Sequence, residues 1–551
     1  MVLEKYLILN KYFLSLFGVK EFKELQEKLR DTQVGVDSEG RTYFVNVLRS
    51  LEGLKIKENL LLKYDENIQN YVKKINYARE PVVLKYFQYL AVLFSEIFFD
   101  NIKNRKREFL EEINEFLKKY GEEEKIDIIN ELKFNEEDFK KIAFWMATGS
   151  GKTLIMHINY YQFFHYNLFS PDNIILITPN LGLSKQHYEE LQKSGIPARL
   201  YSEGISGGRE KEVLVIEITK FVEEKKGGGV TLPVETFEGK NLIFVDEGHK
   251  GKKLEEQKWA RLRNELSREG FVLEYSATFG QILNKKNKET LKEYAKAIIF
   301  DYSYKYFYLD GYGKDFSILN IKNLSQIGKE EFQETMFIAN LLSYYEQLLI
   351  YEKEKERIKD YNLEKPLWIF VGTTVISKKN KSKPTEEEKE TISDVLQIVK
   401  FIKKVIEEEN WLKENINKIL NGETSLKNED NEDIFKERFK YIRNKNYDLD
   451  DIYEKIFNGK GRFSLLEIKN AEGEIGLRTG ENEYFGVINI GDVTGFKKEL
   501  EKEGIEVGQD VISISLFDNI KKEDSKINIL IGSKKFIEGW DTWRVSSMGL
   551  L

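Results

Sequence analysis

The sequence contains no cysteine and only four histidines among its 551 residues. The absence of cysteine excludes a disulfide framework and any metal site built from thiolates. The histidines are His157, His165, His187 and His249. They are too scattered along the chain to indicate a histidine cluster. Any bound metal ion is therefore expected to have oxygen ligands.

Long apolar runs are also absent, and no stretch reaches the roughly 18 apolar residues that a membrane span requires. The opening apolar segment, MVLEKYLILNKYF, already contains Glu4 and Lys5, which is atypical of a signal peptide. We therefore expect a cytoplasmic protein with no membrane partner. The net charge of −7 argues against a wholly basic surface, although a local positive groove could still hold nucleic acid.

What the sequence does contain is a rhythm of short apolar runs and helical stretches between residues 142 and 308. The runs are IAFWMA, NIILIT, EVLVIEI, NLIFVDE, FVLEYSAT and KAIIFDY. This alternation predicts a parallel sheet with crossover helices, and hence the α/β class. A second series begins with PLWIFVGTT (366–374), continues through an expected hairpin turn at Ala471–Gly473 and ends with INILIGS.

The strongest motif is FWMATGSGKT (144–153), a glycine-rich loop between a predicted strand and a predicted helix. Glycines allow backbone N–H groups to face phosphates, the lysine reaches the β and γ phosphates, and the threonine hydroxyl ligates Mg²⁺. Met146 stands where the usual pattern has Gly or Ala. The predicted ATP-binding residues here are Gly149, Ser150, Gly151, Lys152 and Thr153.

Two further strand ends carry polar residues. In NLIFVDEGHKG, Asp246 is predicted to bind Mg²⁺ and Glu247 to activate the attacking water, although a surface turn would have the same composition. In EYSATF, Ser276 and Thr278 are predicted to couple the nucleotide state to bound nucleic acid. Lys152, Asp246 and Glu247 form the predicted catalytic set, and His249 is a further coupling candidate.

The order of these motifs resembles motifs I, II and III of the superfamily 2 helicases of the DEAD/DEAH type. Other family positions can be matched along the chain. The resemblance implies nucleic-acid contacts at Thr178 and Pro179 (motif Ia), Thr219, and Gly372 and Thr373 (motif IV). It implies contacts to ATP at Gly539 and Asp541, in the motif V segment EGWD.

Within that superfamily, Met146, the DEGHKG segment and EGWD resemble the ATPase (Res) subunit of type III restriction enzymes. This implies an ATP-dependent helicase or translocase of a restriction or related defence system, with ATP and Mg²⁺ as cofactors. It also implies duplex DNA and a methyltransferase subunit as partners. The family's motif VI and nuclease domain would follow Leu551, so we expect a truncated chain that binds ATP better than it hydrolyses it.

The resemblance implies two RecA-like domains in tandem, the second incomplete. We expect an N-terminal helical region at 1–81, a first RecA-like domain at 82–310, a helical connector at 311–365 and a second RecA-like domain at 366–551. A helical, charged insertion is expected at about 377–460.

Two alternatives stay open at this point. An RNA helicase shares every motif quoted, and a nucleotide-binding chain without efficient hydrolysis would keep the loop. A nuclease-like pattern, Asp450 or Asp451 with Glu467-x-Lys469, is better explained as part of a strand of the second domain. Gln88 could read adenine, but its position on a helix far upstream of Lys152 favours a structural role.

Overall fold

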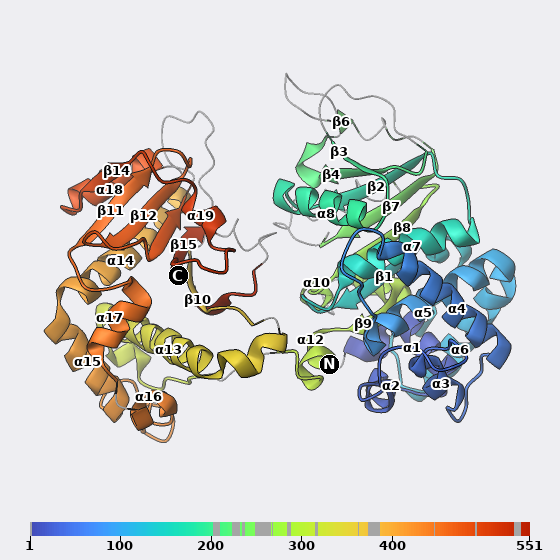
Figure 1. The fold of residues 1–551 in the computed structure, drawn as a ribbon. Coiled ribbons are helices and arrows are strands. Elements are labelled where there is room, and N and C mark those ends of the chain that lie inside the picture. Colours follow the sequence, from blue (N-terminus) through green and yellow to red (C-terminus); the bar gives the residue numbers. More distant parts are fainter. Residues whose placement is uncertain are drawn as a thin grey trace. The chain divides into compact units, whose positions relative to one another are not determined.

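The computed structural model describes residues 3–201, 210–222, 232–233, 237, 239–247, 266, 268–283, 288–313, 318–361, 363–372, 386–445, 447–490, 493–533 and 542–550. The chain divides into two compact units, Met1–Asp315 and Phe316–Leu551, and each has its own sheet (Figure 1). The α/β fold with two RecA-like units in tandem, expected from the motifs, is confirmed.

The first unit contains a seven-stranded sheet in the order β3-β4-β2-β7-β8-β1-β9, in which every pair is parallel. Its strands are β1 (Lys141–Met146), β2 (Asn173–Thr178), β3 (Ala198–Leu200), β4 (Val213–Glu217), β7 (Asn241–Asp246), β8 (Phe271–Ser276) and β9 (Ile298–Tyr302). A separate short pair joins β5 (Phe221–Val222) to β6 (Leu232–Pro233). Because β7, β8 and β1 are neighbours, their carboxyl ends meet at one edge of the sheet.

Both faces of this sheet are covered, which explains the uninterrupted apolar strands. Alternate residues of β2 enter different cores: Ile174 and Leu176 join the large core, whereas Ile175 and Ile177 join a smaller one on the opposite face. Helices α7 (Lys152–Tyr166), α8 (Leu181–Lys193) and α11 (Lys288–Ala297) pack against the strands. The short helices α10 (Phe279–Ile282) and α12 (Tyr304–Leu309) follow β8 and β9.

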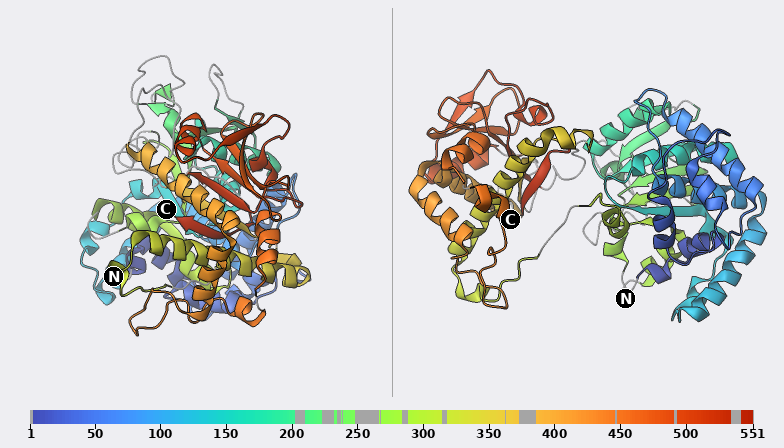
Figure 2. Two further views of the ribbon diagram at one scale, coloured as in Figure 1. Left: turned by 90° about the vertical axis from the view of Figure 1, so that its left-hand side faces the viewer. Right: turned by 60° about the horizontal axis from the view of Figure 1, so that its bottom comes forward.

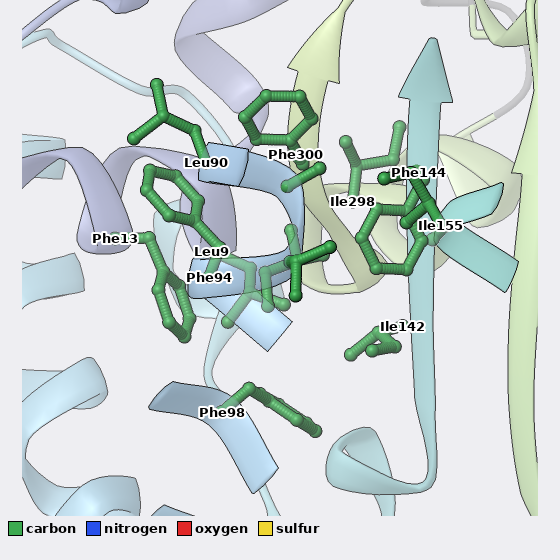
Figure 3. Packing of buried hydrophobic residues seen from close by; sticks show 14 of the residues in the cluster. Leu9, Phe13, Leu90, Phe94, Phe98, Ile142, Phe144, Ile155, Ile298 and Phe300 are labelled. Carbon is green, nitrogen blue, oxygen red and sulfur yellow. The ribbon is translucent and has the colours of Figure 1, made fainter. Parts of the chain in front are cut away.

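The N-terminal helices pack into the first unit (Figure 2). They are α1 (Ile8–Leu16), α2 (Phe22–Leu29), α3 (Tyr43–Arg49), α4 (Glu58–Ile75), α5 (Tyr86–Asn104) and α6 (Lys106–Glu123). Phe94 of α5 stacks on Phe13 of α1 and meets Phe300 of β9 edge-on, with ring centroids 5.5 Å apart in both pairs (Figure 3). Each such fully buried phenylalanine contributes roughly 1.5–3 kcal/mol of burial free energy. The helices are therefore part of the core of this unit.

The second unit has a mixed sheet in the order β14-β11-β12-β13-β15-β10-β16. Its strands are β10 (Leu367–Gly372), β11 (Phe463–Ile468), β12 (Glu474–Thr479), β13 (Gly486–Asn489), β14 (Val507–Asp510), β15 (Ile529–Ser533) and β16 (Val545–Leu550). The hairpin expected at Ala471–Gly473 joins β11 to β12, and it makes β12 antiparallel to both neighbours. This hairpin is why the second sheet is mixed and not wholly parallel.

The helices of the second unit are α13 (Lys329–Ile358), α14 (Glu386–Glu407), α15 (Glu409–Asn421), α16 (Lys440–Lys445), α17 (Leu449–Phe457), α18 (Val493–Lys502) and α19 (Leu516–Asn519). Helix α13, in the segment expected to connect the domains, packs against β16, α15 and α17. Helix α14, in the expected insertion, packs against β10, β11 and β15.

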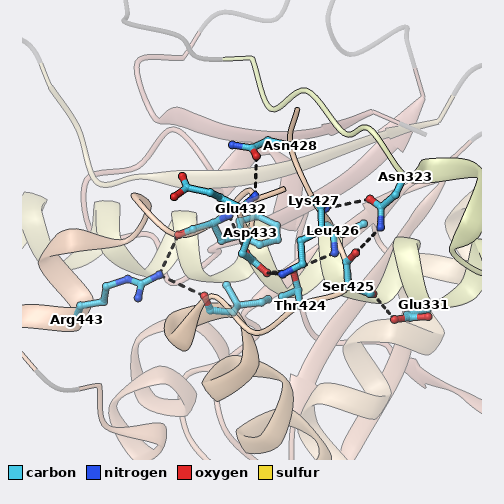
Figure 4. A network of polar contacts seen from close by, with 12 residues as sticks. Asn323, Glu331, Thr424, Ser425, Leu426, Lys427, Asn428, Glu432, Asp433 and Arg443 are labelled. Carbon is cyan, nitrogen blue, oxygen red and sulfur yellow. Dashed lines mark hydrogen bonds and ion pairs between the residues drawn. The ribbon is translucent and has the colours of Figure 1, made fainter. Parts of the chain in front are cut away.

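A polar network ties the start of this unit to the loop after α15 (Figure 4). Asn323 donates to the Ser425 carbonyl at 2.7 Å and accepts from the Lys427 amide at 3.0 Å, while Thr424 donates to Asp433 at 2.6 Å. These bonds hold a loop whose Leu426, Ile434 and Phe435 are also buried in the core of this unit. No helix in the described parts of the chain combines the length and apolarity needed to cross a lipid bilayer.

Candidate functional site

The glycine-rich loop runs from the end of β1 to the start of α7. Gly149 and Gly151 have φ angles of +82° and +90°, a conformation that side chains other than hydrogen disfavour. Ser150 is buried, and its hydroxyl donates to the Ala147 carbonyl at 2.7 Å. The Ala147 amide in turn donates to the Tyr302 carbonyl of β9 at 2.9 Å. The loop is therefore fixed at both the strand and the helix.

Gln88 of α5 contacts this loop directly. Its amide donates to the Ser150 carbonyl at 3.0 Å, and its carbonyl accepts from the Lys85 amide at 2.9 Å. A Cβ at Gly151 would lie only 2.4 Å from Gln88 Nε2. The structural role expected for Gln88 is therefore to contact the glycine-rich loop. The sequence did not reveal this contact, because Gln88 lies far upstream of the loop in the chain.

Lys152, the first residue of α7, extends to the neighbouring strand end. Its ammonium nitrogen lies 3.4 Å from the Met146 carbonyl and 3.3 Å from Oε1 of Glu247. The two charged side chains are 12% and 13% exposed, so they face each other in a largely desolvated place. Two predicted catalytic residues are thereby brought together across β7, β8 and β1.

Glu247 has a positive φ of +52°, which is uncommon for a residue with a side chain and costs about 1–3 kcal/mol. Its carboxylate accepts from the Ser276 hydroxyl at 3.1 Å and from the Ala277 amide at 3.3 Å. The Thr278 amide donates to the Ser276 hydroxyl at 3.0 Å. Ser276 and Thr278 thus lie beside Glu247.

Asp246, the last residue of β7, is 8% exposed. Its Oδ2 lies 2.8 Å from Nε2 of His187 on α8. Sequence reasoning missed His187, because no pattern linked it to a residue so far along the chain. Burial of the Tyr275 side chain raises its pKa well above the usual value, and the negative charge of the neighbouring Asp246 raises it further.

The residue types fit magnesium. Mg²⁺ is usually held by one or two carboxylates together with substrate phosphates, so it does not need an all-protein cage. Within the described residues, no group of three or more His, Cys, Asp or Glu could hold a metal ion by itself. Asp246, with Thr153 as the second residue of α7, supplies the oxygen donors expected for a nucleotide-bound ion.

Thr178, the last residue of β2, makes a hydrogen bond to the helix that follows the strand. Its side chain is fully buried, and its hydroxyl lies 2.6 Å from the Ser184 hydroxyl of α8. The hydroxyl already has this internal hydrogen bond, and its contact with a nucleic-acid phosphate stays a prediction. Pro179, the next residue, is partly exposed.

The remaining predicted residues are only partly covered by the described structure. Thr219 lies in the short 3-10 helix Ile218–Lys220 after β4, and Gly372 is the buried last residue of β10. The residues outside the described parts of the chain are His249, Thr373, Gly539 and Asp541. The strand that leads toward the last two, β15, pairs in parallel with β10.

The nuclease-like pattern falls on ordinary ion pairs. Lys469 pairs with Glu467 at 2.9 Å, and Lys497 pairs with the same carboxylate at 2.9 Å. Asp451 accepts from the Tyr345 hydroxyl at 2.5 Å. Glu467 lies in β11 and Lys469 directly follows that strand, so the structure supports the interpretation of this triplet as part of a strand segment of the second unit.

A glycine-rich loop that enters a helix through a lysine, opposite a strand end carrying Asp-Glu on a parallel sheet, defines a helicase-like ATPase. Residues 102–281 match the family described as "Type III restriction enzyme, res subunit". Over these residues, the resemblance inferred from the motifs is confirmed.

Three solved structures are similar at low levels. T4 UvsW is 11% identical, with 49% of each chain covered and a TM-score of 0.23, so the chain spans about half the length of that structure. The Sulfolobus solfataricus SWI2/SNF2 ATPase core is 11% identical over 74% of this chain and 84% of its own, with a TM-score of 0.24. The same core in complex with dsDNA gives 11% identity, 71% and 83% coverage, and a TM-score of 0.22. No curated protein matches the chain.

Proposed function

We propose that this chain is the ATP-dependent DNA helicase or translocase subunit of a type III restriction-modification or related defence system. ATP and Mg²⁺ are its cofactors, and it moves on duplex DNA. Its partner is a methyltransferase subunit, and both proteins are cytoplasmic. The proposal refines the class of helicase-like ATPase by the family match over residues 102–281.

The observation that carries the ATPase chemistry is the 3.3 Å pair between Lys152 and Glu247. Lys152 holds the β and γ phosphates, and the amides of Gly149, Ser150 and Gly151 bind the phosphate oxygens. Thr153 and Asp246 would hold Mg²⁺, which would supply positive charge beside the phosphates. Glu247 orients and polarises the attacking water from its position beside the lysine.

Coupling to DNA is assigned to the residues that surround this carboxylate. The Ser276 hydroxyl bonds to Glu247 and also accepts from the Thr278 amide, so a change at Glu247 reaches the segment after β8. His249 has the same proposed role, and Gly539 and Asp541 are proposed to contact ATP. DNA contacts are proposed at Thr178, Pro179, Thr219, Gly372 and Thr373.

The test is ATP turnover of the full chain with duplex DNA, single-stranded DNA and duplex RNA at equal nucleotide concentration. Stimulation that is greatest with duplex DNA and lost in Lys152→Ala supports the proposal. Stimulation by RNA alone would favour an RNA helicase instead. ATP binding without stimulated turnover by any nucleic acid would favour a nucleotide-binding chain. Co-purification with the product of an adjacent methyltransferase gene tests the partner.

A further inference from the structure

His187 lies against the proposed magnesium-binding carboxylate from a different element. It is 3% exposed and sits on α8, whereas Asp246 ends β7. Its Nε2 is 2.8 Å from Asp246 Oδ2, whereas its Nδ1 is buried without a hydrogen-bond partner among the described residues. A buried imidazole of this kind is engaged through one nitrogen only.

The partner atom decides which nitrogen carries the proton. An ionised carboxylate only accepts hydrogen bonds, so Nε2 is the donor and Oδ2 the acceptor. Nδ1 then holds a lone pair and needs no acceptor. His187 therefore constrains one oxygen of Asp246 and fixes the plane of that carboxylate.

The helix that carries His187 is itself held at its first turn. Asn180 caps α8 by accepting from the Leu183 amide at 3.0 Å, and Ser184 bonds to the buried Thr178 hydroxyl at 2.6 Å. His187 lies three residues after Ser184 and so projects from the same side of the helix. The end of β2, the helix and the end of β7 are thus joined by short hydrogen bonds.

The last turn of α8 is fixed as well. The Ser194 hydroxyl lies 2.7 Å from Nδ1 of His157 on α7, and Arg79 donates to the same hydroxyl at 2.6 Å. Arg79 also pairs with Glu190 of α8 at 3.2 Å. The helix cannot shift without breaking bonds at both ends, so His187 is a rigid support and not a mobile side chain.

We propose that His187 is a positioning residue that orients Asp246 for Mg²⁺, an assignment that rests on the proposed ATPase function of the same site. Residues that hydrogen-bond a metal-binding carboxylate set its orientation, and their loss typically weakens metal binding about 10- to 100-fold. Because the support comes from α8, the orientation of Asp246 depends on the helix that Asn180, the residue after Pro179, caps.

The experiment uses Mn²⁺ as a spectroscopic substitute for Mg²⁺. Electron paramagnetic resonance measures how tightly Mn²⁺ binds to the full chain in saturating ADP. We expect His187→Leu to weaken Mn²⁺ binding about 10-fold or more while ADP affinity in EDTA stays unchanged. His187→Gln, whose amide nitrogen reaches the position of Nε2, is expected to restore most of the affinity. His187→Asn, whose amide is too short, is expected to behave like His187→Leu.

His165→Gln, on the same unit and away from this carboxylate, is the control for loss of a histidine. Mn²⁺ affinity within twofold of the wild type in both His187→Leu and His187→Asn would overturn the inference. Equal losses in His187→Gln and His187→Asn would also overturn it, because packing and not the hydrogen bond would then be responsible. A wild-type chain that binds no Mn²⁺–ADP would instead refute the proposed function. Thermal unfolding without nucleotide identifies any variant that fails to fold. If His187→Leu fails to fold, the comparison of His187→Gln with His187→Asn tests the inference.

Discussion

The ammonium nitrogen of Lys152 lies 3.3 Å from Oε1 of Glu247, so one ion pair joins the phosphate-binding loop to the Asp-Glu strand end. Both groups are largely shielded from water, and each therefore depends on the other for charge compensation. Incoming ATP phosphates compete with Glu247 for the lysine. Substitutions on the two sides of this pair are therefore expected to have opposite effects on ATP affinity.

Glu247→Gln is expected to reduce ATP turnover about 10²- to 10⁴-fold, because the group that activates the water loses its charge and basicity. ATP affinity is expected to stay equal or to increase, since Lys152 no longer has a competing carboxylate. Single-turnover phosphate release and binding of a fluorescent ATP analogue measure the two effects. Unchanged turnover in DNA-stimulated enzyme would contradict the role given to Glu247.

Lys152→Ala is expected to weaken ATP binding about 10- to 100-fold, since a charge-assisted contact to phosphate contributes roughly 1.5–3 kcal/mol. The same substitution removes the ion pair between Lys152 and Glu247, which adds to the repulsion of the phosphates. Lys118→Ala, at an exposed lysine of α6, is the matched control and should leave affinity unchanged. The measurement is a binding titration, and equal affinity in the two variants would refute the role of Lys152.

Gly151→Ala is expected to impair the loop more than Gly149→Ala. Both positions have positive φ, which costs an alanine about 1–2 kcal/mol, but only at Gly151 would the new Cβ meet Gln88 at 2.4 Å. At Gly149 the nearest atom is Phe307 Cζ at 3.9 Å. The double variant Gln88→Ala/Gly151→Ala should recover part of the melting temperature that Gly151→Ala alone loses. No recovery would mean that backbone strain accounts for the whole loss.

Glu96 predicts a pH dependence of stability. It is buried between α4, α5 and α7, and burial raises its pKa to about 7, against hydrogen bonds from Asn67, Tyr166, Gln162 and Tyr71. Because the folded pKa exceeds the unfolded one, the folded chain binds the proton more tightly. Its contribution is complete below about pH 4.5 and is lost as the pH rises toward 7.

The loss attributable to Glu96 is roughly 3 kcal/mol, at about 1.4 kcal/mol for each pH unit between the two pKa values. Glu96→Gln, which cannot titrate, should remove this component from the curve of unfolding free energy against pH. Denaturant unfolding of both proteins between pH 5 and pH 8 measures it. Parallel curves for the two proteins would show that Glu96 has an ordinary pKa.

Local patterns made much of the fold predictable. The apolar runs became β1, β2, β4, β7, β8, β9, β10 and β15, and the turn at Ala471–Gly473 joined β11 to β12. These features depend on residues close in sequence, where periodicity and turn chemistry act. The proximity of Lys152, Glu247 and Ser276 was also predictable, because each motif lies at the carboxyl end of a strand and parallel strands end at one edge of the sheet.

What the sequence concealed depends on contacts between distant segments. Gln88 reaches Ser150 and His187 reaches Asp246 only after the helices have packed on the sheet. The hydrogen bond between Thr178 and Ser184 was missed for a different reason, because these residues are close in sequence and meet only through the turn into α8. Periodicity identifies a buried face, but it does not identify which polar group a buried residue will meet.

The packing of the first helices against the last strand of the first unit also constrains how the protein is made. Asn10 donates to the Ile299 carbonyl across 289 residues, and Gln26 donates to the Tyr306 carbonyl. At about 5–20 residues per second, the ribosome completes β9 roughly 15–60 s after α1 emerges. During that interval the apolar faces of α1 and α2 have no sheet edge to cover them. Nascent chains of this protein should therefore be long-lived clients of chaperones that bind exposed apolar helices.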